Sequence, residues 1–199
     1  MLYLLRHGDI EASGEKRFIG WTDNPLSLHG REKAVLWGRK FQHMEFSGIW
    51  SSPLQRARET ADIITSLHPP LPGNTVQTAW ELSEINLGTW DGVVMSHIRR
   101  QHPELWRKRG ENIATFRPPE GESFTDLQKR AVHFITHLAT QNTGDLLIVT
   151  HAGVIRVLIC HALNAPLSHL FRIHLNYGGL TIIQADTGVF HIWAVNLSM

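Results

Sequence analysis

Short apolar runs recur along the chain, and their length and β-branched content are typical of buried strands. We predict six strands from these runs, at residues 2–5, 48–51, 75–79, 146–150, 180–184 and 189–195. Between most of these runs the apolar residues recur with the spacing of an amphipathic helix. This alternation of strands and helices predicts an α/β fold, a three-layer αβα sandwich around a mostly parallel central sheet.

Three of the predicted helices have a clear apolar face. These faces consist of Ala34, Trp37, Gly38 and Phe41; of Leu54, Ala57, Ala61 and Ile64; and of Phe124, Leu127, Ala131, Phe134 or Ile135, and Leu138. The second helix is predicted to start with Ser52 as its cap, Pro53 in its first turn and Gln55 at the capping-box position. The third is predicted to run from Ser123 onward.

The residues that follow the predicted strands are unusually cationic. Arg6 and His7 end the first strand, Arg56 comes shortly after the second, and His151 directly follows the fourth. Ligands of open α/β sheets bind beyond the carboxyl ends of the strands, so we expect these four side chains to meet at one rim. Glycines close behind both histidines permit tight turns, and nearby helix starts direct unpaired N–H groups at the same place. The sequence therefore predicts an anion pocket, most economically a phosphate pocket.

Composition and charge narrow the class of protein. The chain has 199 residues, 42% of them hydrophobic, with 19 Lys and Arg against 18 Asp and Glu. We expect one domain, residues 1–199, because the Pro-rich segment 69–74 is too short to separate two. A net charge of +1 does not support binding to nucleic acid or to a membrane surface, and no apolar run approaches the roughly 20 residues that cross a bilayer. The single cysteine, Cys160, favours a cytoplasmic location.

A phosphate pocket with two imidazoles suggests phosphoryl transfer. That reaction needs a nucleophile held in line, positive charge around the phosphoryl oxygens and a proton for the leaving oxygen. A neutral imidazole suits the first role, and arginine forks with a second, protonated imidazole suit the second. Glu81 or Glu84, in a polar loop after the third predicted strand, could supply the proton.

Four blocks of sequence carry these residues: 4–8 (LLRHG), 51–61 (SSPLQRARETA), 82–84 with 88–92 (LSE, GTWDG) and 149–153 (VTHAG). In order and spacing they resemble the histidine phosphatase superfamily, also called the phosphoglycerate mutase-like family. The resemblance implies the fold of that family, with His7 as the residue phosphorylated during turnover. It also implies that Arg6, Arg56 and His151 hold the phosphoryl oxygens and that Glu84, rather than Glu81, donates the proton. No metal or organic cofactor is implied.

Within the superfamily, the chain lengths favour a phosphatase over a mutase. Mutases carry an inserted lid between the acid-bearing loop and the block matched here by residues 119–123, whereas only residues 93–118 fill that interval in this chain. A pocket without such a lid admits water, which favours hydrolysis over return of the phosphoryl group to an organic hydroxyl. We therefore expect a phosphatase that acts on a small phosphorylated substrate.

A narrower resemblance concerns the substrate. Residues 17–27 (RFIGWTDNPLS) resemble the corresponding stretch of α-ribazole phosphatases, which act in cobalamin synthesis. The chain departs from broad-specificity relatives at residues 9–10, at Ser13 and at Ile19, and a less polar pocket mouth suits a leaving group with an apolar or aromatic part. α-Ribazole 5′-phosphate is therefore our substrate hypothesis.

Other classes of function stay open. One is a module that binds phosphorylated ligands without turnover, although such a module needs neither the nucleophile His7 nor the acid Glu84. The others are a broad-specificity phosphatase and an enzyme that acts on phosphohistidine or phosphoserine in proteins, whose substrates would need an open groove. The sequence does not specify an oligomeric state.

Two further groups of residues are interpreted as structural. The basic runs Arg99–Arg100 and Arg107–Lys108–Arg109 are typical of a solvated helix face, with attraction of phosphorylated substrates as a secondary role, and we assign no site to them. His133 and His137 have the i, i+4 spacing of zinc ligands, but the Glu and the third ligand of a zincin motif are absent. We therefore predict no metal site there.

Overall fold

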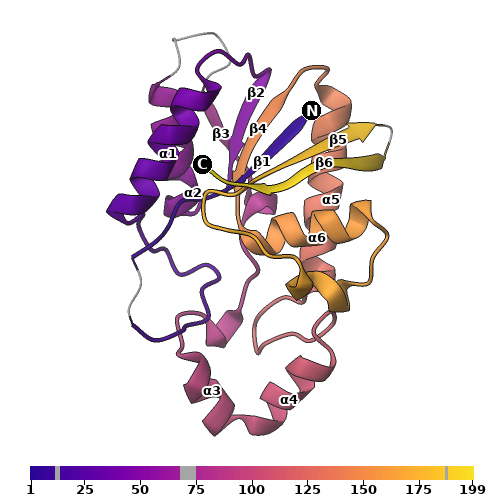
Figure 1. Cartoon of the computed structure of the whole chain (residues 1–199). Coiled ribbons are helices and arrows are strands. Elements are labelled where there is room, and N and C mark those ends of the chain that lie inside the picture. The colour runs from indigo at the N-terminus through magenta and orange to yellow at the C-terminus, as the bar shows by residue number, and fades with distance from the viewer. Residues whose placement is uncertain (12–13, 68–74, 187) are drawn as a thin grey trace.

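A computed structural model describes residues 1–11, 14–67, 75–186 and 188–199 of the chain. In this part of the chain one six-stranded sheet has the strand order β3-β2-β4-β1-β5-β6 (Figure 1). The strands are β1 (Leu2–Arg6), β2 (Gly48–Ser51), β3 (Val76–Thr78), β4 (Leu146–Thr150), β5 (Leu180–Asp186) and β6 (Val189–Leu197). Strands β1 to β4 pair in parallel with one another, whereas β5 and β6 run antiparallel to their neighbours. The predicted mostly parallel sheet is therefore confirmed. The Pro-rich segment 69–74 lies outside the described residues.

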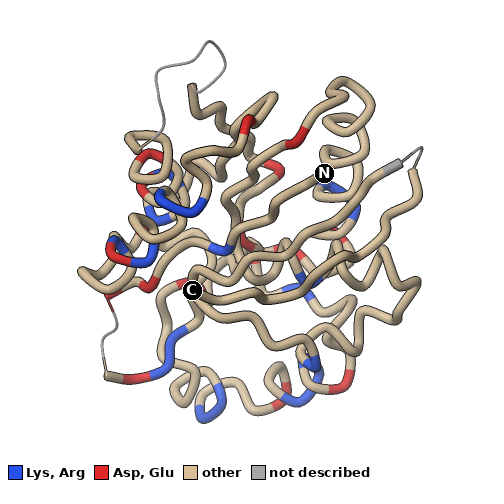
Figure 2. Tube along the Cα trace, turned by 45° about the horizontal axis from the view of Figure 1, so that its top comes forward, with Lys and Arg blue, Asp and Glu red and all other residues tan. Residues whose placement is uncertain are grey.

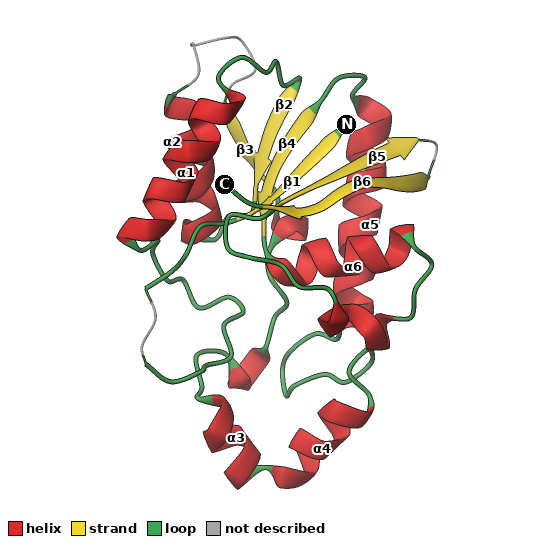
Figure 3. Ribbon diagram, viewed as in Figure 1, coloured by secondary structure: helices red, strands yellow, loops and turns green. Residues whose placement is uncertain are grey.

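Helices cover both faces of the sheet, which confirms the three-layer architecture (Figure 3). The helices are α1 (Leu28–Phe41) and α2 (Gln55–Ser66) on one face and α5 (Phe124–Gln141) and α6 (Ala152–Ala162) on the other. Two short helices, α3 (Met95–Gln101) and α4 (Pro103–Glu111), lie beyond the carboxyl ends of the parallel strands. Short 3₁₀ segments complete the described chain: η1 (Trp80–Leu82), η2 (Gly88–Trp90) and η3 (Leu167–Arg172).

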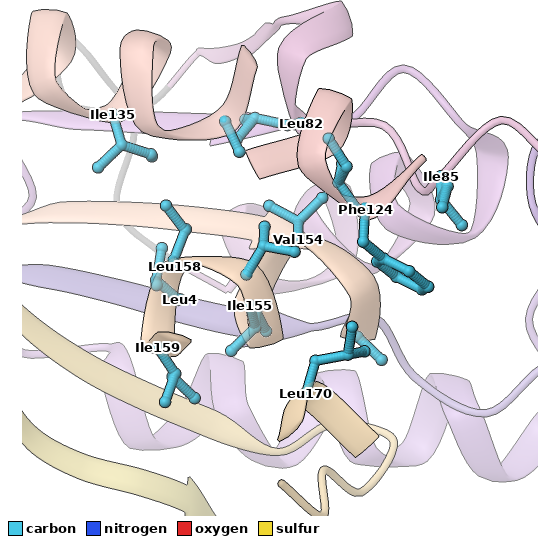
Figure 4. Packing of buried hydrophobic residues seen from close by; sticks show 14 of the residues in the cluster. Leu4, Leu82, Ile85, Phe124, Ile135, Val154, Ile155, Leu158, Ile159 and Leu170 are labelled. Atoms are coloured by element: carbon cyan, nitrogen blue, oxygen red, sulfur yellow. The ribbon is translucent and has the colours of Figure 1, made fainter. Parts of the chain in front are cut away.

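The strand register sends alternate side chains into two cores. Leu4 of β1 is paired with Ile148 of β4, and both belong to the cluster under α5 and α6. Leu5 is paired with Val149, and both belong to the cluster under α1 and α2. Figure 4 shows Leu4 close to the α6 residue Leu158. Because side chains alternate between the faces of a sheet, a strand buried on both faces is largely apolar, as β4 is in the four residues before Thr150.

Helix starts near the site follow local hydrogen bonding, with one correction to the sequence prediction. The α5 helix begins at Phe124 with Ser123 as its N-cap, which agrees with the predicted start, and Ser123 forms a capping box with Asp126. The α2 helix begins at Gln55, and its N-cap is Leu54 rather than Ser52. The Ser52 hydroxyl accepts a hydrogen bond from the Leu54 N–H at 3.2 Å, while Leu54 stays extended, so the helix starts later than predicted.

The distribution of charged residues shows no long run of one sign along the described chain. Acidic and basic positions are interspersed over the helices and loops (Figure 2). In the described part of the chain, no helix combines the length and the apolar character needed to cross a membrane.

Candidate active site

The pairing of β1 with β4 brings two predicted site residues together. Arg6 and Thr150 are register partners at the ends of these strands, so His7 and His151 follow side by side. The His7 N–H donates to the Thr150 carbonyl at 3.0 Å, and the His7 carbonyl accepts from the Gly178 N–H at 3.0 Å. The two imidazole rings have centroids 5.1 Å apart. The backbone around both histidines is therefore fixed by the end of the sheet.

The protonation state of His7 follows from its contacts. Its Nδ1 atom lies 2.7 Å from the Gly8 carbonyl oxygen, which only accepts hydrogen bonds, so Nδ1 carries the hydrogen and Nε2 keeps its lone pair. The ring is 4% exposed. Burial, together with the charges of Arg56 and Arg6, holds the pKa of His7 well below its ordinary value of 6.5. At neutral pH the ring is a neutral imidazole with a free Nε2.

The loop after His7 makes unusually close backbone contacts. The Gly8 N–H donates to the Thr60 hydroxyl of α2 at 3.1 Å. A Cβ atom at Gly8 would lie 2.5 Å from the Gly30 carbonyl oxygen of α1, a distance that side chains do not tolerate. Glycine at this position therefore lets the His7 loop lie between α1 and α2.

His151 is fully buried and is oriented by Ser52. The His151 Nε2 and Ser52 Oγ atoms are 2.8 Å apart, whereas His151 Nδ1 is buried without a hydrogen-bond partner among the described residues. Since Ser52 Oγ already accepts from the Leu54 N–H, its own hydrogen is free to donate to Nε2, which favours the tautomer with hydrogen on Nδ1. Burial and the Arg56 charge hold the pKa of His151 well below 6.5. The free protein thus holds this ring neutral.

The Arg6 side chain is held by a carbonyl and an aromatic ring. Its Nη1 atom donates to the Leu175 carbonyl at 2.7 Å, and its guanidinium lies 3.6 Å from the centroid of the Tyr177 ring. Tyr177 also contacts His7, with the two rings 5.4 Å apart. Burial lowers the pKa of Arg6, although this group stays charged. Its Nε atom is buried without a hydrogen-bond partner in the described part of the chain.

Arg56, in the first turn of α2, is 1% exposed and is fixed by the loop of residues 20–22. It donates to the carbonyls of Thr22 at 2.9 Å and Gly20 at 2.6 Å. The Asp91 carboxylate fixes that loop in turn, because it accepts from the N–H groups of Gly20, Trp21 and Thr22 at 2.7 to 2.8 Å. Asp91 therefore positions the carbonyls that hold the Arg56 guanidinium.

The Glu84 carboxylate faces the first turn of α6. One oxygen accepts from the Ile85 N–H at 2.9 Å and the other from the Gly153 N–H at 3.1 Å. A Cβ atom at Gly153 would collide with this carboxylate, so the glycine makes room for it. Glu84 thereby reaches the same helix start that follows His151.

Arg130 of α5 organises the loop that carries Glu84. It donates to the carbonyls of Glu81, Ser83 and Glu84 at 2.7, 2.9 and 3.1 Å, and it also pairs with the Glu122 carboxylate. Glu81 therefore meets this cation through its backbone carbonyl. Three hydrogen bonds from this guanidinium hold the loop against α5, and two more bind the Glu122 carboxylate.

A cavity of about 320 Å³ opens beside these residues. Arg6, Glu84, Gly153 and Tyr177 line its inner end. The rest of its wall is mostly apolar and also contains three arginines and one glutamate. It consists of Arg17, Phe18, Ile19, Ile85, Leu87, Met95, Arg109, Ile113, Phe116, Pro118, Glu122, Phe124, Ala152, Arg156 and Phe171. Ile19 thus lies in the wall, whereas Ser13 lies outside the described residues. The interval 93–118 contributes part of this wall, so the segment expected to leave the pocket open covers one side of it.

The basic runs divide between the surface and this cavity. Arg99, Arg100, Arg107 and Lys108 are exposed, as a solvated helix face requires. Arg109 is half-buried and lines the cavity, which corrects its interpretation as part of that face. On a short helix with no buried apolar residue, the sequence pattern carried no signal for which basic residue turns inward.

The structure brings together Arg6, His7, Arg56, Glu84 and His151, and it adds residues that the sequence analysis missed. Ser52 and Asp91 lie within the sequence blocks that carry the resemblance, so their position in those blocks was an available signal. Arg130 and Tyr177 lie outside the blocks. Neither has a pattern in one sequence that distinguishes it from a surface or core residue.

Comparisons with known proteins identify the family. The model of the histidine phosphatase superfamily (branch 1) matches residues 2–198. The structure of Bacillus stearothermophilus YhfR is similar with a TM-score of 0.86 and 33% identity, over 99% of this chain and 97% of that one. The adenosylcobalamin/α-ribazole phosphatase of Salmonella typhimurium is 29% identical over 98% of this chain and 95% of its own length. A putative phosphoserine phosphatase 2 of Hydrogenobacter thermophilus is 27% identical over 93% of this chain and 89% of its own length. The chain therefore belongs to the histidine phosphatase superfamily, branch 1, and is a phosphatase of that type.

Proposed function

We propose that this phosphatase hydrolyses the phosphate monoester of a small metabolite through a phosphohistidine intermediate on His7. The observation that carries the proposal is the buried, neutral His7 ring, whose Nδ1–H is engaged by the Gly8 carbonyl and whose Nε2 is free. A nucleophile in this state needs no general base. The neighbouring Arg6, Arg56 and His151 provide donors for the phosphoryl oxygens.

In the first step the His7 Nε2 lone pair forms a bond to phosphorus while the ester P–O bond breaks. The leaving oxygen takes a proton from Glu84, which enters the step as the carboxylic acid. Arg6, Arg56 and His151 donate hydrogen bonds to the three non-bridging oxygens, and their buried Nε and Nδ1 atoms support this role. An incoming phosphate dianion also favours the protonated form of His151.

In the second step a water oxygen attacks phosphorus, and the N–P bond to His7 breaks. Glu84, now a carboxylate, takes the proton of that water, and inorganic phosphate leaves. Both proposed steps therefore use the same acid–base residue, Glu84, and neither step uses a metal or an organic cofactor.

The cavity wall supports a leaving group with an apolar or aromatic part. Phe18, Ile19 and Phe171 supply that surface. α-Ribazole 5′-phosphate, an intermediate of cobalamin synthesis, is the specific candidate favoured by residues 17–27 and by the Salmonella relative. We propose that the reaction takes place in the cytoplasm, where the buried free thiol of Cys160 stays reduced.

The test is phosphate release from a panel of esters in the presence of EDTA. The panel contains α-ribazole 5′-phosphate, sugar phosphates, 3-phosphoglycerate and 4-nitrophenyl phosphate, and His7→Ala is the control. We expect EDTA-resistant hydrolysis that falls more than about 10⁴-fold in His7→Ala, because the nucleophile is lost. Intact-mass spectrometry after rapid acid-free quenching should show a transient gain of one phosphoryl group in the wild-type chain only.

The outcomes separate the classes of function. Equal activity of His7→Ala and wild type would contradict the phosphohistidine mechanism. No phosphate release from any ester of the panel, with phosphate esters still bound, would favour a binding module or a protein substrate. Comparable rates on simple esters and on α-ribazole 5′-phosphate would make the enzyme a broad-specificity phosphatase.

A further inference from the structure

Two arginines in the cavity wall differ from most other buried or paired arginines in the chain. Arg109 of α4 and Arg156 of α6 are half-buried, and among the described residues neither forms an ion pair with a carboxylate. By contrast, Arg107, two residues before Arg109, pairs with Glu111, and Arg130 pairs with Glu122. Burying a guanidinium without a counter-charge costs free energy, and an anion bound beside it recovers that cost.

The two guanidinium groups flank one aromatic ring at the mouth of the cavity. The Arg109 and Arg156 Cζ atoms lie 5.8 and 5.5 Å from the centroid of the Phe171 ring. Arg109 also lies 5.3 Å from the centroid of Phe18. An arginine stacked on an aromatic face keeps the in-plane N–H donors at its edge, so it can still bind an anion with two parallel hydrogen bonds.

Arg156 links this pair to the inner end of the cavity. Its Nε donates to the Ile173 carbonyl at 3.0 Å, which fixes the side chain. The two terminal nitrogens are left to donate to a ligand. Burial lowers the pKa of both Arg109 and Arg156, and the charges of Glu84 and Arg6 also act on Arg156. The Arg156 guanidinium therefore lies within electrostatic range of the inner end.

The carboxylates that share the cavity wall are already engaged. Glu122 pairs with Arg130, and both oxygens of Glu84 accept backbone N–H groups. Within the described residues neither of them forms an ion pair with Arg109 or Arg156, although the Glu84 charge is near enough to favour the charged form of Arg156. The two arginines thus add positive charge to a cavity whose inner end already suits a phosphoryl group.

We propose that Arg109 and Arg156 form a second anion subsite, so that the preferred substrate is a phosphate ester whose leaving group carries a carboxylate or another anion. This inference rests on the proposed phosphatase function and sharpens its substrate class. Residues 17–27 and the Salmonella relative favour α-ribazole 5′-phosphate, whose leaving group is neutral, whereas these two arginines favour phosphorylated acids, and the substrate comparison decides between the two. The substrate would lie with its scissile phosphate at His7, its apolar part against Phe18 and Phe171, and its second anion between the two guanidinium groups.

Matched pairs of substrates test the subsite directly. 4-Carboxyphenyl phosphate and 4-carbamoylphenyl phosphate have nearly the same shape and differ in the charge of the leaving group. O-Phosphoserine and O-phosphoethanolamine form a shorter pair that differs by one carboxylate. For at least one pair we expect kcat/KM to be about tenfold or more higher for the member that carries the carboxylate, and we expect added salt to weaken that preference.

Variants then assign the preference to these residues. In Arg109→Gln and Arg156→Gln the loss on the carboxylate-bearing member should exceed the loss on its partner at least about tenfold, and Arg109→Lys should retain part of the preference because it keeps the charge. Lys108→Gln is the matched control, since it removes the same charge from an exposed position next to Arg109. We expect it to leave the preference unchanged.

A binding measurement separates failure of the subsite from failure of the phosphatase. Calorimetric titration of His7→Ala with the two phenyl phosphates measures their affinities without turnover, and we expect about tenfold tighter binding of the carboxylate. Equal affinities and equal kcat/KM values within both pairs would overturn the subsite, even if 4-nitrophenyl phosphate is hydrolysed. A preference that persists in both Gln variants would also overturn it. Tighter binding of the carboxylate by a chain that hydrolyses nothing would support the subsite and reject the phosphatase.

Discussion

The inner and outer ends of the cavity are built in different ways. Beside the inner end, His7, Arg56 and His151 are almost completely buried and do not themselves line the cavity, and strand ends or backbone carbonyls fix each of them. At the outer end Phe171 is 52% exposed, and Arg109 lies over the rings of Phe18 and Phe171, which come from segments far apart in the sequence. The inner end is held by the sheet, whereas the outer end depends on loops and short helices.

This difference separates chemistry from specificity. Phosphoryl transfer needs donors held in one geometry, and the ends of neighbouring parallel strands provide such positions. Recognition of a leaving group tolerates many solutions, and loops on a rigid scaffold can vary without disturbing the sheet. Changes at the inner end should therefore alter the rate for every substrate, while changes at the outer end should alter the ranking of substrates.

Glu84→Gln should give the largest effect that depends on the leaving group. We expect kcat on alkyl phosphates to fall about 10³-fold, because the alkoxide loses its proton donor, whereas 4-nitrophenyl phosphate needs little protonation and should be affected far less. Steady-state kinetics on the two classes of ester provide the measurement. Glu81→Gln is the control, since that side chain is three residues away and does not line the cavity. Equal losses on both classes would assign the acid to another residue.

Arg56→Lys should lower kcat for all substrates by about 10²-fold. Lysine keeps the charge but cannot hold the Gly20 and Thr22 carbonyls while donating to a phosphoryl oxygen. The matched control is Arg58→Lys, two residues along α2, where the guanidinium is exposed and paired with Asp62. Kinetics on an alkyl and an aryl ester check the result. A loss confined to one ester would mean that Arg56 serves specificity rather than chemistry.

The fold was largely predictable because its signals are local. Strands such as β4, apolar in its first four residues, and helices with a regular apolar face fix the order of elements, and that order restricts a parallel sheet to few topologies. The start of α2 was misplaced because Pro53 and Ser52 are typical of a helix start, whereas Ser52 here contacts His151. A contact between residues 99 positions apart leaves no trace in local sequence.

The candidate site was predictable only at its inner end. Arg6 ends β1, His7 and His151 directly follow β1 and β4, and topology alone brings them to one rim. Arg109 and Arg130 depend instead on which way a helix turns relative to a distant loop. For Arg130 that relation appears only in its hydrogen bonds to the carbonyls of residues 81, 83 and 84.

The buried histidines predict a dependence of stability on pH. The pKa values of His7 and His151 lie below 6.5 in the folded chain, so from 6.5 down to those values the unfolded chain binds more protons. The free energy of unfolding should therefore decrease as pH falls below about 6.5, by up to about 1.4 kcal/mol per pH unit for each histidine. Above that pH the two residues should contribute no slope.

Urea unfolding between pH 7.5 and 5 provides the measurement. In the wild type His151 makes the unfolding constant rise by up to about tenfold for each pH unit below 6.5, and His151→Asn should remove this contribution to the slope. The exposed control His137→Asn should leave the slope unchanged. NMR of the histidine ring protons should show two rings that do not titrate near pH 6.5. The same slope in His151→Asn and wild type would contradict a neutral, buried His151.

Phe171→Leu should give the smallest effect and should mark the outer end as the site of specificity. Leucine keeps apolar surface but removes the aromatic face on which Arg109 and Arg156 rest, so we expect KM to rise about fivefold for aryl phosphates while kcat stays within twofold. Trp193→Leu, at an exposed aromatic residue of β6 outside the cavity wall, is the control. A fall in kcat as large as that of Arg56→Lys would show that both ends of the cavity serve the chemical step, and the separation between them would then be wrong.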